Sequence, residues 1–476
     1  MSFNSYIFIL LFFPVFMMIY YLCFRRYRPE MQMILLLIAS FIFYAYQHME
    51  YLPLLCFNIA FNYAIYRMLR QCGRYKKFFL VSGILLNLGI LVYFKYYNFF
   101  IDNLNLFFRM NLKIHEVVLP MGISFIVFQQ IAFLVDTYME RIPKTNLLSY
   151  SVLISYFPHV SSGPILVAED FLKQLPFLSR NISWERFASG LYIFVMGFGK
   201  KVLVADIFAK AVDWGYGNIA QLNSTSALFV SIAYSIQIYF DFSGYSDMAM
   251  GISRMLQIEI PNNFNSPYKA DTILDFWDRW HISLTKFLTK YVYIPLGGNR
   301  EGKWKTYINI MIVFVVSGLW HGASWTFVVW GALHGLFMVV VRHYKSFFEK
   351  VPLILNKVIT LSFVNLTWIL FRAGSFHTFR DMMRALLKNN WGALNRDICD
   401  AMAPALVKMI DMSLPYWFWT VIILFVVFIM IFFCKNVQEK SVALKYSFSS
   451  AIWVVMVAII SLLSLSGVSS FVYELF

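Results

Sequence analysis

Long apolar runs separated by short polar segments make up most of the chain. Such runs begin near Tyr6, Met31, Tyr51 and Phe78, and each has roughly the 20 residues that a helix needs to cross the hydrocarbon core of a bilayer. A transmembrane β-barrel would instead show short segments of alternating polarity. The pattern therefore predicts an all-α polytopic membrane protein.

Further apolar runs extend this pattern to the end of the chain. We expect spans at 117–135, 147–166, 187–209, 227–251, 307–341, 358–371, 416–434 and 449–468. The whole pattern predicts about eleven crossings. It also predicts a single multi-pass domain over residues 1–476, because no internal repeat or long linker divides the chain. Residues 98–110 are amphipathic and predict a helix on the outer membrane interface, and residues 262–305 form a long polar stretch.

Composition and charge exclude other classes of protein. Apolar residues make up 60% of the chain and charged residues 14%, whereas about a quarter of a soluble domain is charged. The net charge of +15 comes from Lys and Arg in short loops, which is typical of contact with membrane lipid and not with nucleic acid. Arg25, Arg26 and Arg28 follow the first run, but the loop at Glu50 has no Lys or Arg, so we expect the N-terminus outside. The five cysteines are scattered and predict neither a metal site nor a disulfide framework.

A first histidine lies in the polar stretch. Trp277, Trp280, His281 and Tyr291 recur at helical spacing, which predicts one amphipathic helix over 275–291 with His281 on the face of both tryptophans. The Ile-Pro-Leu-Gly-Gly segment at 294–298 predicts a sharp reversal. A re-entrant helix that dips into the membrane fits this pattern, and a structural role for His281 is the alternative.

A second histidine lies inside an apolar run. Residues 307–341 contain no charged residue, so His321 within them is a functional hypothesis by default. We expect two slightly short helices that meet at His321 and leave it at the floor of a funnel. Gly318 and Gly322 would permit close helix contact, and the hydroxyl of Ser317 or Ser324 could orient the imidazole. A buried structural histidine is again the alternative.

Other polar residues inside apolar runs favour structural roles. Asp241 and Asp247 would be costly to bury without a partner, so we expect them to pair with Lys or Arg or to hold a histidine tautomer. For His334, packing is at least as plausible as catalysis. His159 lies beside a Pro/Gly break and could line a cavity.

Several motifs follow one another in a distinctive order. They are the segments 119–125 and 239–247, Phe-Trp-Asp-Arg-Trp-His-Ile-Ser at 276–283, Tyr-Ile-Pro-Leu-Gly-Gly-Asn-Arg at 293–300, and Leu-Trp-His-Gly at 319–322. Together these motifs resemble the membrane-bound O-acyltransferases, and within them the bacterial alginate O-acetylation type. The resembling core covers residues 119–372. The resemblance implies that His321 is catalytic and that His281 is a second active-site residue. It also implies an enzyme of the bacterial cytoplasmic membrane.

The resemblance further implies a path for the acyl group. The group would pass from a cytoplasmic donor through the membrane core to a polysaccharide outside, often by way of an extracytoplasmic acetyltransferase or acyl-carrier partner. Residues 157–165 are closer to the teichoic-acid D-alanylation acyltransferases, which keeps D-alanyl transfer as an alternative. The chain beyond Arg372 favours the alginate type, because the D-alanylation proteins are usually shorter.

The chemistry of acyl transfer fits these residues. A neutral imidazole at His321 can act as a general base or form an acyl-imidazole, and the sequence leaves both open. No tightly bound cofactor is expected. If the donor is acetyl-coenzyme A, its phosphates could bind the basic residues Lys200, Lys201, Arg300, Lys303 and Lys305. The positive-inside rule explains the same residues without a ligand. A transporter or flippase and a multi-span scaffold are the competing classes.

Overall fold

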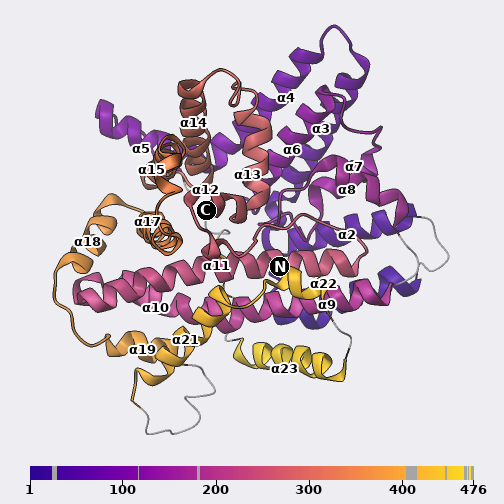
Figure 1. Cartoon of the computed structure of the whole chain (residues 1–476). Coiled ribbons are helices and arrows are strands. Elements are labelled where there is room, and N and C mark those ends of the chain that lie inside the picture. The colour runs from indigo at the N-terminus through magenta and orange to yellow at the C-terminus, as the bar shows by residue number, and fades with distance from the viewer. Residues whose placement is uncertain are drawn as a thin grey trace. The chain divides into compact units, whose positions relative to one another are not determined.

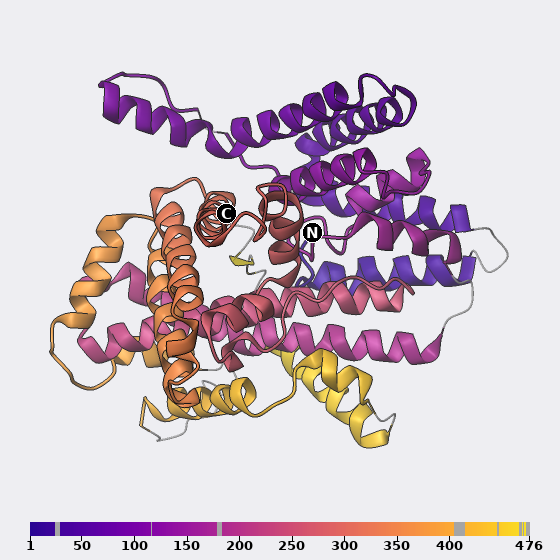
Figure 2. The same cartoon turned by 45° about the horizontal axis from the view of Figure 1, so that its top comes forward.

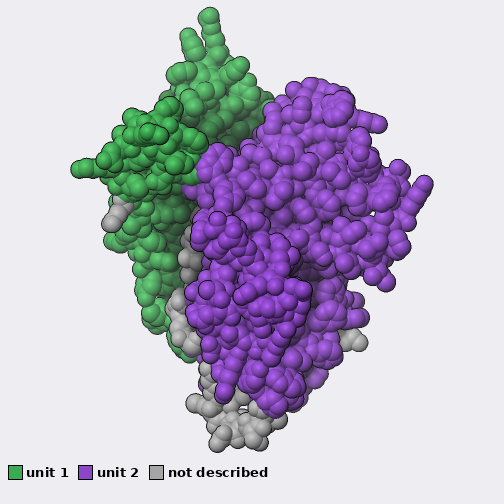
Figure 3. Space-filling view, turned by 90° about the vertical axis from the view of Figure 1, so that its left-hand side faces the viewer, with its two compact units in different colours: residues 1–191, 249–261 green, residues 192–248, 262–476 purple. Residues whose placement is uncertain are grey.

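A computed structural model describes residues 1–23, 29–115, 117–178, 183–403, 415–444, 447–465, 469 and 471–472. These residues form helices and loops with no strand among them, and one isolated bridge pairs Phe264 with Trp280. They fall into two compact units, which Figure 3 colours green and purple. Unit 1 comprises Met1–Leu191 and Ala249–Pro261, and unit 2 comprises Tyr192–Met248 and Asn262–Phe476. The single domain predicted above stays a prediction.

Unit 1 is built from helices of the first part of the chain (Figure 1). They are η1 Ile7–Phe12, α1 Phe13–Met18, η2 Ile19–Cys23, α2 Pro29–His48, η3 Met49–Tyr51, α3 Leu52–Gln71, α4 Lys76–Leu91, η4 Val92–Tyr96, α5 Tyr97–Phe108, α6 Ile123–Tyr138, α7 Leu147–Ser155, α8 Ala168–Gln174 and η5 Leu175–Phe177. Helix α5 confirms that the amphipathic segment at 98–110 is helical. Its place at the outer interface stays a prediction.

A buried network of amides joins α3, α4, α6 and α7. The amide of Asn58 donates to Asn87 at 3.1 Å, and Asn87 donates to Asn62 at 2.6 Å. Gln130 donates to Asn58 at 2.7 Å and accepts a hydrogen bond from Tyr150. Polar side chains in apolar helices are stabilised by such interhelical bonds, so this network fixes how the helices of unit 1 pack.

The span expected at 147–166 is wrong, because α7 ends at Ser155 after nine residues. Nine residues rise only about 14 Å, too little to cross a bilayer. Pro158 explains the end: it lacks a backbone donor, and it disfavours helical geometry at Phe157 before it. The chain instead turns back as a buried loop, in which Phe157 N donates to Ser40 Oγ at 3.1 Å.

Unit 2 contains the later helices, and α9 and α11 contribute residues to both units. Its elements are α9 Trp184–Gly199, η6 Lys200–Ala205, α10 Asp206–Gly217, η7 Ile219–Gln221, α11 Ser224–Met255, η8 Pro267–Lys269, α12 Ile273–Arg279, α13 Ile282–Leu288, η9 Thr289–Tyr293, α14 Lys303–His321, α15 Trp325–His343, α16 Lys345–Phe348, α17 Leu353–Ala373, α18 Phe376–Leu387, α19 Arg396–Met402, α21 Phe418–Phe432, α22 Val437–Val442 and α23 Phe448–Ser464. Helices α14 and α15 lie side by side, as Figure 1 and Figure 2 show.

Four helical stretches among the described residues are long and apolar enough to cross a membrane. They are Pro29–Gln71, Lys76–Phe108, Trp325–His343 and Leu353–Ala373. Shorter apolar helices cover Ile7–Tyr21, Ile123–Tyr138, Phe418–Phe432 and Phe448–Ser464. The protein is therefore a helical membrane protein, and the count of about eleven crossings stays a prediction.

Candidate active site

The charge-free run at 307–341 forms the expected helical hairpin of α14 and α15. Its helices have 19 residues each, about 28 Å, because both extend into the charged segments that flank the run. A Cβ atom at Gly318 would lie 2.2 Å from the carbonyl oxygen of Phe327, and one at Gly331 would lie 2.2 Å from that of Phe314. The predicted close contact at Gly318 is thus confirmed, and the sequence reading missed its partner Gly331.

His321 is the last residue of α14 and is 2% exposed. Its ring lies 5.0 Å from Trp320, 5.2 Å from Trp330 and 5.4 Å from Phe371, measured between centroids. Ser317 and Ser324 were the two candidates for orienting the imidazole. The hydroxyl of Ser324 instead accepts the amide N–H of Thr326 as the cap of α15. Rings from α15 and α17 therefore pack around His321.

His281 lies at a break between two helices, not within one. The single amphipathic helix expected at 275–291 is wrong: α12 ends at Arg279, α13 begins at Ile282, and His281 has left-handed backbone angles of φ 45° and ψ 52°. Trp280 and Trp277 consequently face different neighbours, and His281 shares no helical face with them. Left-handed geometry at a residue with a side chain costs on the order of 1 kcal/mol or more, and such residues cluster at functional sites.

Contacts with the preceding loop hold this break. Asn263 accepts the backbone N–H of Ile282 at its carbonyl oxygen (3.0 Å) and that of Ser283 at its side-chain oxygen (3.2 Å). On the other side of the break, Asn265 N donates to the carbonyl of Arg279 at 3.0 Å. These hydrogen bonds replace those of a continuous helix, and the residues that make them lie in the loop before α12. Helical periodicity therefore carries no signal for them.

The break brings His281 next to His321. The two imidazole centroids are 6.4 Å apart, and both rings flank Trp320. From α11, Phe242 packs edge-on against His281 at 4.7 Å. His281 is fully buried. Two residues 40 positions apart thus present their imidazoles to one small volume, as expected for a shared site.

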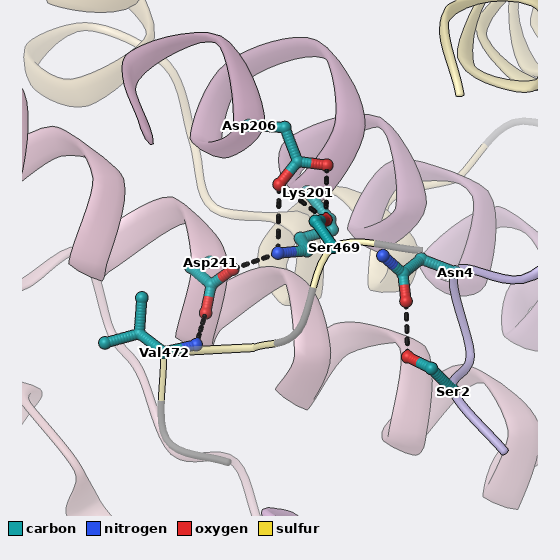
Figure 4. A network of polar contacts seen from close by, with 7 residues as sticks. All are labelled: Ser2, Asn4, Lys201, Asp206, Asp241, Ser469 and Val472. Carbon is teal, nitrogen blue, oxygen red and sulfur yellow. Dashed lines mark hydrogen bonds and ion pairs between the residues drawn. The ribbon is translucent and has the colours of Figure 1, made fainter. Parts of the chain in front are cut away.

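Lys200 and Lys201 form buried ion pairs with the carboxylates that the sequence analysis singled out. Lys200 Nζ lies 2.6 Å from Asp247. Figure 4 shows the second cluster, in which Lys201 Nζ lies 2.6 Å from Asp241 and 2.9 Å from Asp206. The structural pairing expected for Asp241 and Asp247 is confirmed. These contacts account for both lysines without a donor phosphate.

Two carboxylates of this cluster also hold the C-terminal segment (Figure 4). Ser469 Oγ donates to Asp206 at 2.9 Å, and the backbone N–H of Val472 donates to Asp241 at 2.7 Å. The Phe471 ring packs on Lys201 Nζ at 4.6 Å. The cluster is thus a cross-link between α10, α11 and the end of the chain.

Arg300, Lys303 and Lys305 have a different environment, since all three side chains are exposed. They lie at the reversal before α14 and in its first turn. The reversal at 294–298 is confirmed: Gly297 and Gly298 have positive φ, and the Asn309 amide donates to the carbonyls of Leu296 and Gly298 at 3.1 and 2.9 Å. The basic side chains are therefore presented by a turn that α14 itself anchors.

A cavity of about 210 Å³ lies between the hairpin and the segment that comprises α12, α13 and η9. It is lined by Trp277, Asp278, Leu284, Thr285, Leu288, Thr289, Tyr293, Ile310, Val313, Phe314, Ser317, Met338 and Arg342. Burial and the neighbouring carboxylate of Asp275 raise the pKa of Asp278. Along α14 the lining runs from Ile310 to Ser317, one helical turn before His321. The cavity therefore leads from the charged end of the hairpin toward the histidine pair.

Two further histidines are buried outside this pair. His334 of α15 is fully enclosed and bonds Trp277 and Thr367. In unit 1, His159 Nε2 lies 3.0 Å from the carbonyl of Leu153. Neither was predicted as a site residue, and only their position inside apolar runs signalled them.

Comparison with known proteins identifies the class. Residues 90–377 match the membrane-bound O-acyltransferase family, so the chain belongs to this family and is an acyltransferase. The family inferred from the motifs is confirmed.

Individual relatives narrow the comparison. The chain is 38% identical to a peptidoglycan O-acetyltransferase of Helicobacter pylori over 82% of this chain and 80% of the relative. It is also 38% identical to a probable alginate O-acetylase of Pseudomonas aeruginosa, over 81% and 75%. A teichoic acid D-alanyltransferase of Bacillus subtilis is 27% identical over 55% and 71%. The similarity is thus greater and more extensive to the two O-acetylation proteins.

Proposed function

We propose that this acyltransferase moves an acetyl group from a cytoplasmic thioester donor to hydroxyl groups of a polysaccharide outside the bacterial cytoplasmic membrane. The facing pair of buried histidines, His281 and His321, carries the proposal. Acyl transfer needs a base or nucleophile beside the reacting carbonyl, and an imidazole can serve as either. The O-acetylating names of two relatives at 38% identity favour acetyl.

The proposed reaction forms one bond, breaks one bond and moves one proton. The oxygen of the acceptor hydroxyl forms a bond to the thioester carbonyl carbon, the C–S bond breaks, and the acceptor's proton passes through imidazole to the departing thiolate. His321 takes the proton in the direct route. In the alternative route its ring nitrogen first accepts the acyl group and then yields it to the acceptor. With ring centroids 6.4 Å apart, His281 is near enough to orient a group that reacts at His321.

The donor would reach the pair through the cavity along α14. Its 210 Å³ suits the arm of a small thioester, and Arg342 lies at the end opposite Ser317. Arg300, Lys303 and Lys305 are exposed and free to meet phosphates, whereas the ion pairs of Lys200 and Lys201 argue against a donor role for these two. Acetyl-coenzyme A is the donor we propose, as a substrate and not as a resident cofactor.

The proposed sidedness follows from charge. Arg300, Lys303 and Lys305 around the start of α14 favour a cytoplasmic position for that end by the positive-inside rule, so that His321 would lie toward the outer surface. By the same rule, the arginines that follow the first apolar run favour an N-terminus outside. A group emerging there would pass to a polysaccharide, directly or by way of an extracytoplasmic acetyltransferase or acyl-carrier partner.

D-alanyl transfer to teichoic acid is the second candidate, favoured by the segment 157–165 and by the relative at 27% identity. Both candidates are tested with purified protein and two soluble thioesters, acetyl-coenzyme A and a D-alanyl thioester, by following release of free thiol. Faster release from acetyl-coenzyme A supports the proposal, and faster release from the D-alanyl thioester replaces it with the second candidate. A transporter or scaffold would release thiol from neither.

A further inference from the structure

His334 stands at the centre of a hydrogen-bonded chain that crosses three helices. The indole N–H of Trp277 in α12 donates to His334 Nδ1 at 3.3 Å. On the other side of the ring, Nε2 lies 2.9 Å from Thr367 Oγ1 of α17. Thr367 in turn donates to the carbonyls of Phe363 and Val364. This chain of hydrogen bonds therefore runs from α12 through α15 to α17.

The partners determine where the proton of the imidazole lies. An indole nitrogen can only donate, so Nδ1 must accept. The hydroxyl proton of Thr367 is directed to a backbone carbonyl, so Thr367 accepts from Nε2–H. Only the neutral Nε2–H tautomer satisfies both bonds. Because the ring is fully buried, losing either partner would leave a polar atom without compensation.

One end of this chain of hydrogen bonds is Trp277, in the helix α12 that precedes His281. Trp277 belongs to the last turn of α12, four residues before His281. Its ring packs against Phe314 at 5.2 Å and Trp330 at 5.9 Å, on the hairpin that carries His321. The bond to His334 adds direction to this packing, because a hydrogen bond fixes the rotation of the indole and apolar contacts alone do not.

We infer that His334 is a positioning residue for acyl transfer: by accepting the Trp277 N–H it holds α12 in the register that sets His281 against His321. This inference rests on the proposed function of that pair. His334 itself bonds no group of the pair. Its removal should act through geometry, where a displacement of about 1 Å can cost on the order of 100-fold in rate.

Four variants separate this role from general packing. His334→Asn keeps an acceptor near the position of Nδ1, and His334→Gln keeps a donor near Nε2 but loses that acceptor. His334→Phe keeps the ring volume and loses both. Thr367→Val is the matched control, since it removes an equally buried bond at the other end of the chain and leaves the bond to Trp277. We expect His334→Phe and His334→Gln to lower kcat/KM for acetyl-coenzyme A hydrolysis about 10- to 100-fold, His334→Asn to restore most of the rate, and Thr367→Val to stay within about twofold of wild type.

A double-mutant cycle with Trp277→Phe supplies the second readout, because residues that act through one bond are not additive. The rate of Trp277→Phe/His334→Phe should match that of the slower single variant. Three results would each overturn the inference. The first is a double variant whose loss of rate is the product of the two single losses. The others are equal rates for His334→Asn and His334→Phe, and a loss in Thr367→Val as large as that in His334→Phe. If His334→Phe does not fold, the Asn and Gln variants decide.

The same assay distinguishes failure of this inference from failure of the proposed function. Wild-type protein without activity, or His321→Ala with full activity, refutes the function itself. Active wild-type protein, inactive His321→Ala and undiminished His334→Gln would refute only the role of His334.

Discussion

A single methyl group added at Gly318 should disrupt the proposed active site without touching either histidine. The Cβ of Gly318→Ala would lie 2.2 Å from the Phe327 carbonyl oxygen, about 1.2 Å short of the 3.4 Å at which ordinary contact begins. The obstacle is backbone, so no side-chain rotation relieves it, and α14 and α15 must separate by about that distance. Such overpacking costs about 1–3 kcal/mol. Because His321 follows Gly318 by less than one turn, its ring moves with the helix.

The assay compares thermal unfolding and acetyl-coenzyme A hydrolysis in purified protein. A shift of about 1 Å at a reacting group predicts a rate loss on the order of 100-fold, together with a lower unfolding midpoint. Gly89→Ala is the matched control: it places the same methyl group on helix α4, where nothing lies within 4 Å of the new atom. Since Ala favours a helix over Gly by about 1 kcal/mol, this variant should keep the wild-type rate and unfold at the wild-type midpoint or slightly above it. Wild-type rate and midpoint in Gly318→Ala would refute the reasoning.

Three other predictions concern the histidine pair, the buried charges and the sidedness. His281→Ala should lower turnover strongly yet leave a trace, and turnover equal to wild type would reduce the site to His321. Lys201→Met should cost about 3–5 kcal/mol of stability, because it leaves buried carboxylates without their cation. The control is the more exposed ion pair of Lys76 with Glu140, 2.8 Å apart, and Lys76→Met should unfold at the wild-type temperature. Equal unfolding midpoints for the two variants would contradict the role of burial. In a background without native cysteines, Ser324→Cys should react with a membrane-impermeant thiol reagent added outside, whereas Lys303→Cys should react only after the membrane is opened, and the reverse pattern would invert the proposed direction of transfer.

The sequence was most informative where one local signal decided the structure. The absence of charge over 307–341 predicted two helices that meet at His321, and α14 indeed ends at this residue while α15 begins at Trp325. The reversal at 294–298 was likewise readable from Pro and Gly, whose backbone preferences act within a few residues.

The sequence misled where distant residues decide the local geometry. Helical spacing continues through Trp280 and His281, but Asn265 bonds the last residue of α12 and Asn263 bonds the first residues of α13. Periodicity indicates which face of a helix is apolar, and it cannot predict hydrogen bonds from a neighbouring loop. The apolar run at 147–166 failed for a related reason: its hydropathy suits a span, while Pro158 and the buried loop it begins stop the helix.

Charge was ambiguous for a third reason. Lys200 and Arg300 are both basic residues beside apolar runs, and the sequence predicted one role for both. Only the fold separates them, because Asp247 is 47 positions from Lys200 and lies 2.6 Å from it, whereas Arg300 is exposed. A pattern of charges along a chain cannot distinguish a lysine in a buried ion pair from a basic residue that could bind a phosphate.

The most direct test of the account is the rate of acyl transfer by His321→Ala at equal membrane insertion. Loss of a general base predicts a fall of about 10²- to 10⁴-fold, with near-normal expression, because an alanine leaves a small cavity and no unpaired charge. His343→Ala is the matched control, an imidazole removed from the opposite end of the same hairpin, and its rate should stay near wild type. Wild-type transfer of acetyl groups by His321→Ala would contradict the central claim.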